Sequence, residues 1–189
     1  VEAERWTAPF YWEARDGQWW HFTLRGMRPV DPHEPVTHLS YFEADAYARW
    51  ASHQWAGARL ATEFEWEAAA RAVWDGEGLP EGNFVEGGRL HPSAAEPLAS
   101  GDGAPSAPRL LQMFGDAWEW TASAYTAYPG YAPVPGALGE YNGKWMSGSF
   151  VLRGGSCATS RTHIRPTYRN FFHPAATWQF TGLRLARSL

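Results

Sequence analysis

The sequence is poor in cysteine, in long apolar runs and in runs of basic residues. Cys157 is the single cysteine among 189 residues, which excludes a disulfide bond within the chain. No segment has enough consecutive apolar residues to span a bilayer. The formal net charge is −4, which disfavours nucleic acid as a partner. We therefore expect a cytoplasmic protein that binds neither membranes nor nucleic acid.

Several familiar catalytic motifs are also missing. The sequence has no Gly-x-Ser-x-Gly, no P-loop, no Gly-x-Gly-x-x-Gly and no Cys-x-x-Cys. Its seven histidines are never three or four residues apart, so it offers no local histidine pair for iron or zinc. We therefore expect no iron site made by this chain.

Aromatic residues, glycine and proline are abundant. The chain contains 12 Trp, 10 Phe and 8 Tyr, with 19 Gly and 14 Pro. Aromatic side chains bring a large buried area per residue, whereas Gly and Pro interrupt regular structure with turns. This composition predicts one compact domain of mixed fold, with much irregular backbone that aromatic side chains hold in place.

Short strands are predicted in three places. Residues 10–13 and 19–24 are aromatic segments on either side of Asp16-Gly17, a turn signal. Residues 36–40 have the composition of a strand, and Asn142-Gly143 predicts a hairpin.

Residues 75–108 are rich in Gly and Pro without periodicity, which predicts a long surface loop.

Two helices are predicted, each beginning with a capping box, in which Ser or Thr precedes Glu by three residues. Ser40 and Glu43 form the first box, and Thr62 and Glu65 form the second. The first helix extends through residue 51 and the second covers residues 63–71. Helical spacing places four residues of the first helix on one face: Phe42, Ala46, Tyr47 and Trp50.

Two groups of polar residues are ambiguous. Glu63, Glu65 and Glu67 have alternate spacing, which spreads them around the second helix, so no acid–base pair follows. Glu119 lies in a predicted strand over residues 110–121 that is broken at Gly115-Asp116. With nearby carbonyl oxygens Glu119 is a candidate calcium ligand, and a buried structural hydrogen bond is the alternative.

The segment 151–187 combines a buried strand, a polar loop and a return strand. Residues 151–156 are apolar and run into Gly154-Gly155, and residues 182–187 alternate apolar and cationic side chains. Between them the chain carries a polar group followed by Asn170-Phe171-Phe172; the polar group is Arg161, His163, Arg165 and Arg169. This arrangement predicts a ligand-binding wall, with structural ion pairs as the alternative for the arginines.

Four segments together resemble the formylglycine-generating-enzyme (sulfatase-modifying factor) superfamily. They are residues 59–71 (RLATEFEWEAAAR), 115–120 (GDAWEW), 152–156 (LRGGS) and 182–184 (GLR). The resemblance extends over residues 1–189 as a single domain. It implies an α+β fold, a variant of the C-type lectin fold with a small twisted antiparallel sheet, two helices and long irregular loops.

The chain departs from true formylglycine-generating enzymes at their copper site. Those enzymes carry two copper-binding cysteines, at positions that match the vicinity of Thr159 and Ile164. Cys157, the single cysteine here, is too close to the Gly-Gly turn. A linear bis-thiolate needs two sulfurs, so a formylglycine-generating oxidase stabilised by calcium is the weakest of three alternatives.

A closer resemblance is to the C-terminal domain of the hercynine oxygenases, the sulfoxide synthases of ergothioneine biosynthesis. It lies in residues 10–12, 19–20, 57–60, 128–130, 157–159 and 167–172. The resemblance implies an iron(II)- and O2-dependent oxidoreductase that joins cysteine to the imidazole of trimethylhistidine (hercynine). In that family three histidines of an N-terminal DinB-like domain hold the non-haem iron, through a His-x-x-x-His-x-Glu motif and one upstream histidine.

This chain has no such motif, so we expect a fragment that lacks the iron-binding domain and is inactive alone. A non-catalytic lectin-like binding module is the second alternative.

The resemblance also implies roles for individual residues. Asn170 and Phe171 would contact the carboxylate and trimethylammonium groups of hercynine. Phe172 replaces an aspartate of the family members that use γ-glutamylcysteine, which implies free cysteine as co-substrate. Arg165 and Arg169 would recognise carboxylates or serve the structure.

The proton-donating tyrosine of the family matches Tyr128. Tyr125 and Tyr131 in the same loop are the alternatives, and packing is the ordinary role of such residues.

Overall fold

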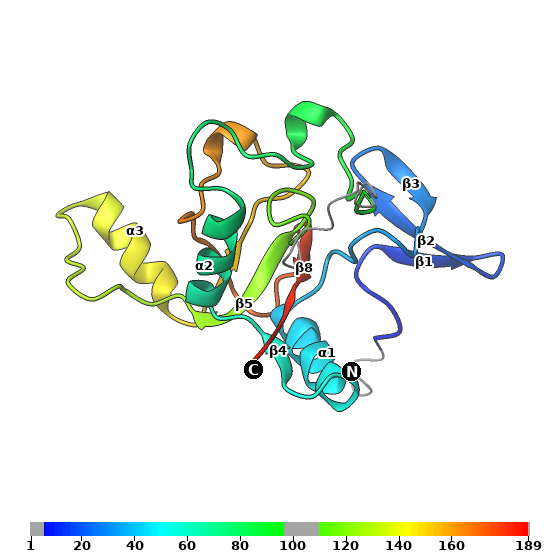
Figure 1. Ribbon diagram of the computed structural model, residues 1–189, viewed down its shortest axis with the longest axis horizontal. Helices are drawn as coiled ribbons and strands as arrows, with labels where there is room; N and C mark the ends of the chain where they lie inside the picture. Colours follow the sequence, from blue (N-terminus) through cyan, green and yellow to red (C-terminus); the bar gives the residue numbers. More distant parts are fainter. Residues whose placement is uncertain (1–5, 97–109, 189) are drawn as a thin grey trace, which may run out of the picture.

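The computed structural model describes residues 6–96 and 110–188, and it has an α+β architecture (Figure 1). The helices are α1 (Tyr41–Gln54), α2 (Glu63–Val73) and α3 (Ala137–Met146), with two 3₁₀ turns, η1 (Val85–Gly87) and η2 (Arg161–His163). The strands are β1 (Trp12–Arg15), β2 (Gln18–Thr23), β3 (Gly26–Pro29), β4 (Ala58–Leu60), β5 (Trp118–Ala124), β6 (Phe150–Arg153), β7 (Asn170–Phe172), β8 (Thr181–Leu183) and β9 (Leu185–Arg187).

The strands form three small sheets, not one. β1-β2-β3 make an antiparallel sheet at one end of the molecule, opposite α3 (Figure 1). β4 pairs with β9, and the central sheet has the order β7-β6-β5-β8. β8 runs parallel to β5, whereas the other two strand pairs of this sheet are antiparallel. The expectation of one antiparallel sheet is therefore corrected to one mixed and two antiparallel sheets.

The turn signal predicted the β1–β2 hairpin of the first sheet, whereas the strand β3 was not predicted. Asp16 and Gly17 both have positive φ, 48° and 76°, and join β1 to β2 in a two-residue hairpin. Residues 36–40, in contrast, are not a strand. His38 has a φ of 66°, and the backbone N–H of Leu39 bonds to the Thr181 carbonyl at 3.0 Å. A positive φ breaks extended backbone, so no ladder can continue through this segment.

Both predicted helices and their capping boxes are confirmed. The side chains of Ser40 and Thr62 accept hydrogen bonds from the N–H of Glu43 and Glu65, and the two glutamates bond back to the cap residues. The face that helical spacing predicted for α1 is its exposed one: the buried residues are Ala44, Ala48 and Ala51, and the four predicted residues are all exposed. Alanine allows α1 to lie close against β4, which the aromatic side chains would prevent.

The predicted hairpin at Asn142-Gly143 is also wrong, because these residues lie inside α3. An Asn-Gly pair gives a hairpin when alternating strands flank it, and no strand flanks this one. α3 therefore adds a third helix to the two that were expected. Among the described residues, none of the helices combines the length and hydrophobicity that crossing a membrane requires.

Two expectations for the middle of the chain change as well. Residues 110–117 are irregular, and the strand starts only at Trp118, because Gln112, Gly115 and Asp116 all have positive φ. The loop expected over residues 75–108 contains η1, and its residues 97–108 lie outside the described part.

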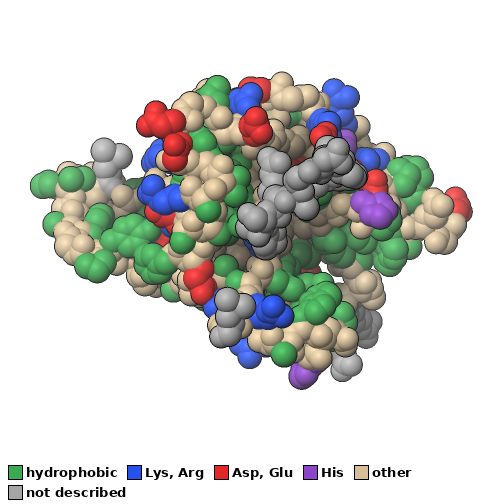
Figure 2. All heavy atoms as spheres, in the orientation of Figure 1, with side chains coloured by type: hydrophobic (Ala, Val, Ile, Leu, Met, Phe, Trp, Pro, Cys, Tyr) green, Lys and Arg blue, Asp and Glu red, His purple; other side chains and the backbone are tan. Residues whose placement is uncertain are grey.

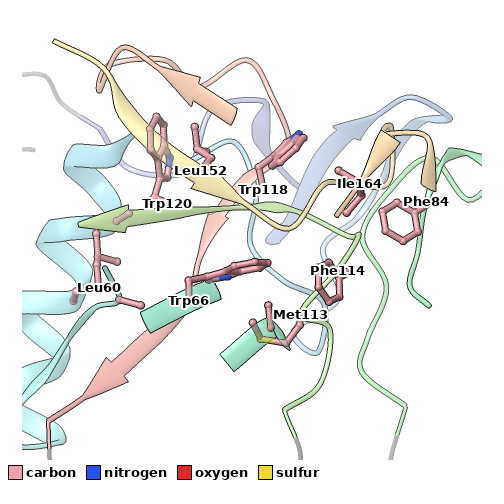
Figure 3. Packing of buried hydrophobic residues seen from close by; sticks show 13 residues of the cluster. Leu60, Trp66, Phe84, Met113, Phe114, Trp118, Trp120, Leu152 and Ile164 are labelled. Carbon is pink, nitrogen blue, oxygen red and sulfur yellow. The ribbon is translucent and has the colours of Figure 1, made fainter. Parts of the chain in front are cut away.

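The core lies between α2 and the central sheet. Trp66 of α2 packs edge-on to Phe114, and both belong to a cluster with Trp118, Trp120 and Leu152 (Figure 3). Gly154 and Gly155 end β6 with φ of 100° and 87°, as the sequence predicted. A Cβ on Gly155 would lie 3.1 Å from Phe84 and Ile164, so the turn leaves no room for a side chain.

The single cysteine lies beside this turn. Cys157 is fully buried, its N–H bonds to the Asp116 carbonyl at 3.1 Å, and burial raises the pKa of its thiol to about 12. The thiolate is the reactive form of cysteine, and its population near neutral pH is therefore very small.

We predict that Cys157 is protected from thiol reagents in the native protein. At about pH 8 an aromatic disulfide reagent should modify it at least about 100-fold more slowly than in denaturant, where the thiol regains an ordinary pKa. Absorbance of the released thiolate measures the rate. Rapid modification of the native protein at this pH would contradict the burial of the thiol.

Candidate functional site

The candidate site lies where the loop after β5 meets the residues leading into β7. The ring of Tyr125 stacks on Phe171 with centroids 4.0 Å apart and planes inclined by 5°. The Arg169 guanidinium lies 4.6 Å from the Tyr125 ring centroid and 4.3 Å from that of Tyr128. Four of the residues predicted from the sequence therefore come together here.

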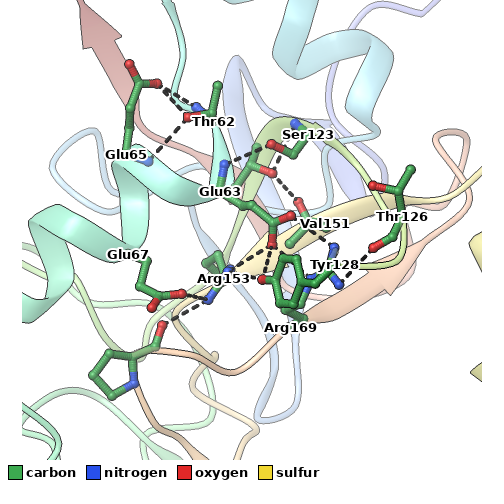
Figure 4. Close-up of polar contacts among 12 residues, drawn as sticks. Thr62, Glu63, Glu65, Glu67, Ser123, Thr126, Tyr128, Val151, Arg153 and Arg169 are labelled. Atoms are coloured by element: carbon green, nitrogen blue, oxygen red, sulfur yellow. Dashed lines mark hydrogen bonds and ion pairs between the residues drawn. The ribbon is translucent and has the colours of Figure 1, made fainter. Parts of the chain in front are cut away.

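A buried carboxylate, which the sequence pattern did not indicate as a site residue, joins this group to α2. Glu63, only 2% exposed, accepts a hydrogen bond from Arg169 Nη2 on Oε1 at 2.9 Å (Figure 4). Its Oε2 accepts from Arg153 Nη2 at 2.9 Å and from the Tyr128 hydroxyl at 3.1 Å. Glu63 therefore contacts three segments that are distant in sequence.

Arg153 is the second buried charge of this network. Its side chain has no exposed area, and its Nη1 donates to the Pro166 carbonyl at 2.9 Å and to Glu67 Oε2 at 3.2 Å. Glu63 and Glu67 are four residues apart and thus share a helix face. The alternate spacing of Glu63, Glu65 and Glu67 suggested that these side chains are spread around the helix. The i, i+4 spacing of Glu63 and Glu67 was the signal that could have indicated a shared partner.

The two candidate arginines differ in their surroundings. Arg169 donates from Nη1 to the Thr126 carbonyl at 3.0 Å and from Nη2 to Glu63, and its side chain is 14% exposed. Arg165 is exposed, and its guanidinium lies 5.4 Å from the centroid of the Tyr168 ring. The contacts of Arg169 fit the structural role considered for it, whereas Arg165 has an exposed charge.

Asn170 uses one of its two amide hydrogens in bonds to the residues that the structure describes. Its Oδ1 accepts from the N–H of Phe171 at 2.9 Å, and its Nδ2 donates to Gln179 Oε1 at 3.3 Å. The bond to Oδ1 assigns the orientation of the amide. The second Nδ2 hydrogen is the group that remains to meet an acceptor such as a carboxylate.

Phe172 is half-buried and lies edge-on to Trp178, at 5.3 Å between centroids. Because side chains alternate along a strand, Asn170 and Phe172 lie on one face of β7 and Phe171 lies on the other. β7 is an edge strand of the central sheet. The structure therefore divides the predicted Asn-Phe-Phe group between two faces that meet at this edge.

The three loop tyrosines are not equivalent. Tyr128 donates its hydroxyl hydrogen to Glu63, whereas no hydrogen bond to the Tyr125 hydroxyl is formed within residues 6–96 and 110–188. Burial is the main cause that raises the pKa of both phenols. Tyr131 is 42% exposed and takes part in a turn through its N–H, which bonds to the Tyr128 carbonyl at 3.0 Å.

Glu119 is buried among donors. It accepts from Trp66 Nε1 at 2.7 Å and from Arg184 Nη2 at 2.8 Å. These contacts fit the buried hydrogen-bonded carboxylate that was the alternative to a calcium ligand. In the part of the chain that the structure describes, no three His, Cys, Asp or Glu side chains are grouped so that they could hold a metal ion. These residues therefore do not fit an iron site.

A cavity of about 850 Å³ lies elsewhere, between α1, residues 110–117 and the β8–β9 segment. Its lining includes Asp116, Glu119 and Arg184, whose side chains are already paired with protein groups. Glu119, the candidate calcium ligand, lines it, whereas none of the predicted substrate-binding residues or loop tyrosines does. A polar ligand would find few free partners there, so we place the candidate site at the β7 edge.

Comparisons with known proteins agree in both sequence and fold. Hercynine oxygenases of Mycobacterium tuberculosis and Mycolicibacterium smegmatis are 37% and 38% identical to this chain, over 95% of its length. The chain spans 42% of the length of each of these relatives.

PvdO from Pseudomonas aeruginosa has a similar structure, with a TM-score of 0.62 and 23% identity, over 94% of this chain and 70% of that one. This likeness shows the fold alone and agrees with the expected variant of the C-type lectin fold. The model of the sulfatase-modifying factor enzyme 1-like domain matches residues 1–189, and the chain therefore belongs to this family.

Proposed function

We propose that this chain is the substrate-binding domain of a hercynine oxygenase, the O2-dependent, non-haem iron(II) sulfoxide synthase of ergothioneine biosynthesis in the cytoplasm. Its identity of 37–38% to hercynine oxygenases over 95% of the chain carries the proposal. Trimethylhistidine and cysteine are the proposed substrates.

Phe171 and Asn170 are proposed to bind the two charged groups of trimethylhistidine. An aromatic face attracts a quaternary ammonium group, and a stacked pair such as Tyr125 and Phe171 is rigid. The free Nδ2 hydrogen of Asn170 can donate to the carboxylate. Both groups lie at the β7 edge, so one ligand that crosses this edge can reach them.

Tyr125 is proposed as the proton donor in place of Tyr128. The Tyr128 hydroxyl already donates its hydrogen to the Glu63 carboxylate, so that hydrogen is engaged within the protein. Tyr125 stacks directly on the proposed ligand residue Phe171, and its raised phenol pKa keeps the proton in place at neutral pH. A donor must hold its proton until the transition state needs it.

The iron ligands are proposed to come from a separate helical, DinB-like domain. The described residues contain no suitable group, so the roles proposed for this chain are limited to binding, orientation and proton transfer. The site is bordered by aromatic residues that are largely exposed: Phe64 at 64%, Tyr141 at 56% and Trp145 at 44%. Figure 2 shows hydrophobic side chains gathered around α3. Such a surface suits a partner domain.

The first test is binding of trimethylhistidine to the purified chain by calorimetry. Asn170→Ala should weaken binding by about tenfold, because one hydrogen bond to a charged group is lost, and Asn170→Asp should weaken it further by repulsion. Gln54→Ala, an exposed change on α1, is the control and should leave affinity unaltered. Equal affinities of the Asn170 variants and the native chain would contradict the proposed role.

The second test compares two tyrosines in the enzyme assembled with its iron-binding domain. Tyr125→Phe should lower kcat by about 100-fold or more, the contribution expected of a general acid, with little change in KM. Tyr128→Phe should lower kcat less, because it removes one hydrogen bond to Glu63. The opposite order would return the role to Tyr128.

The third test concerns the thiol. Phe172 carries no charge to pair with the amino group of a longer thiol substrate, so kcat/KM should favour cysteine over γ-glutamylcysteine. Phe172→Asp should raise turnover of γ-glutamylcysteine by about tenfold, the effect of one charged hydrogen bond. Phe172→Asn introduces a side chain of nearly the same shape as aspartate but without the charge, and it serves as the control. Equal or better native turnover with γ-glutamylcysteine would overturn the choice of thiol.

A further inference from the structure

We propose that Glu63 is a specificity-determining residue: it occupies the guanidinium of Arg169 and thereby leaves the substrate carboxylate to Asn170. This inference rests on the proposed function, because it concerns which of two neighbouring groups binds the carboxylate. Arg169 and Asn170 are neighbours in the chain, and a guanidinium and an amide both bind carboxylates well.

The geometry leaves Arg169 little capacity for a ligand. Nη2 donates to Glu63 Oε1 at 2.9 Å, and Nη1 donates to the Thr126 carbonyl at 3.0 Å. The rings of Tyr125 and Tyr128 lie against the guanidinium, with centroids 4.6 Å and 4.3 Å from it. Protein groups therefore surround the cation on its faces and its edge.

The carboxylate of Glu63 is a stronger competitor than a substrate carboxylate. Its side chain is 3% exposed, so the protein has already removed it from water. A substrate that displaced it would leave a buried charge with fewer partners, and it would also lose its own hydration. Glu63 is further held in place by Arg153 and by the Tyr128 hydroxyl, both on Oε2.

Asn170 shows the opposite arrangement. Its amide is oriented by the N–H of Phe171 and by Gln179, and within residues 6–96 and 110–188 its second Nδ2 hydrogen has no protein acceptor. A neutral donor with a fixed direction binds a carboxylate less strongly than a guanidinium does, but it defines the position of the ligand. Neutralising Arg169 is thus what makes Asn170 the preferred partner.

The direct test is chemical modification of arginine with phenylglyoxal, mapped by mass spectrometry on the purified 189-residue chain. In the native chain Arg165, which is exposed, should react at least about tenfold faster than Arg169, and the fully buried Arg153 should not react. In Glu63→Gln, Arg169 should become about tenfold more reactive while Arg165 is unchanged. Glu67→Gln, which alters a partner of Arg153 and Arg71 but not a partner of Arg169, is the matched control. Equal reactivity of Arg165 and Arg169 in the native chain would overturn the inference.

Binding adds a second, independent measurement. In Arg169→Gln the affinity for trimethylhistidine should stay within about threefold of the native value, since the substrate does not use this cation. A loss of tenfold or more would show that binding depends on Arg169 and would refute the role of Glu63. This variant keeps the inference testable if Glu63→Gln does not fold.

The two proposals fail in different ways. If the native chain binds no trimethylhistidine while Arg169 is protected and Glu63→Gln exposes it, the proposed substrate is wrong and the occupation of Arg169 by Glu63 stands. If trimethylhistidine binds and Arg169 reacts as readily as Arg165, the proposed function stands and the role of Glu63 is wrong.

Discussion

The buried carboxylate of Glu63 is the interaction on which the site depends. It lies at the first residue of α2 and contacts Arg153 at the end of β6, Tyr128 in the loop after β5 and Arg169 before β7. Burying one carboxylate with two guanidinium groups is costly unless each group is hydrogen-bonded, and here both carboxylate oxygens accept bonds. The network therefore fixes one arrangement of four segments and places the Tyr125–Phe171 pair at the sheet edge.

Aromatic packing stabilises the parts of the fold outside this network. Short strands and irregular loops have few backbone hydrogen bonds of their own, so large aromatic side chains such as Trp66, Trp118 and Trp120 hold them together. β7 contributes only three residues at the edge of the central sheet. An edge strand exposes side chains of both faces to one ligand, and this is how Asn170 and Phe171 can serve the same substrate although they point in opposite directions.

Hydrogen bonding also distinguishes the charged side chains with a structural role from the groups that can still bind a ligand. Arg169 and Arg153 are engaged with buried partners, and Glu119 is engaged by Trp66 and Arg184. The large cavity beside Glu119 is consequently lined by apolar surface and satisfied polar groups. The Asn170 amide, which keeps hydrogen-bonding capacity among the described residues, lies instead at the β7 edge, next to a surface rich in exposed aromatic residues.

The sequence by itself determined the features that depend on neighbouring residues. The capping boxes of Ser40 and Thr62, the Asp16-Gly17 turn and the Gly154-Gly155 turn all follow from contacts within a few residues, and family motifs indicated the fold. Only the tertiary structure decided which face of α1 is buried, whether Asn142-Gly143 forms a hairpin or a helix, and which partner each arginine takes. Glu63 and Arg169 are 106 residues apart, and no local pattern encodes a contact between residues that folding alone brings together.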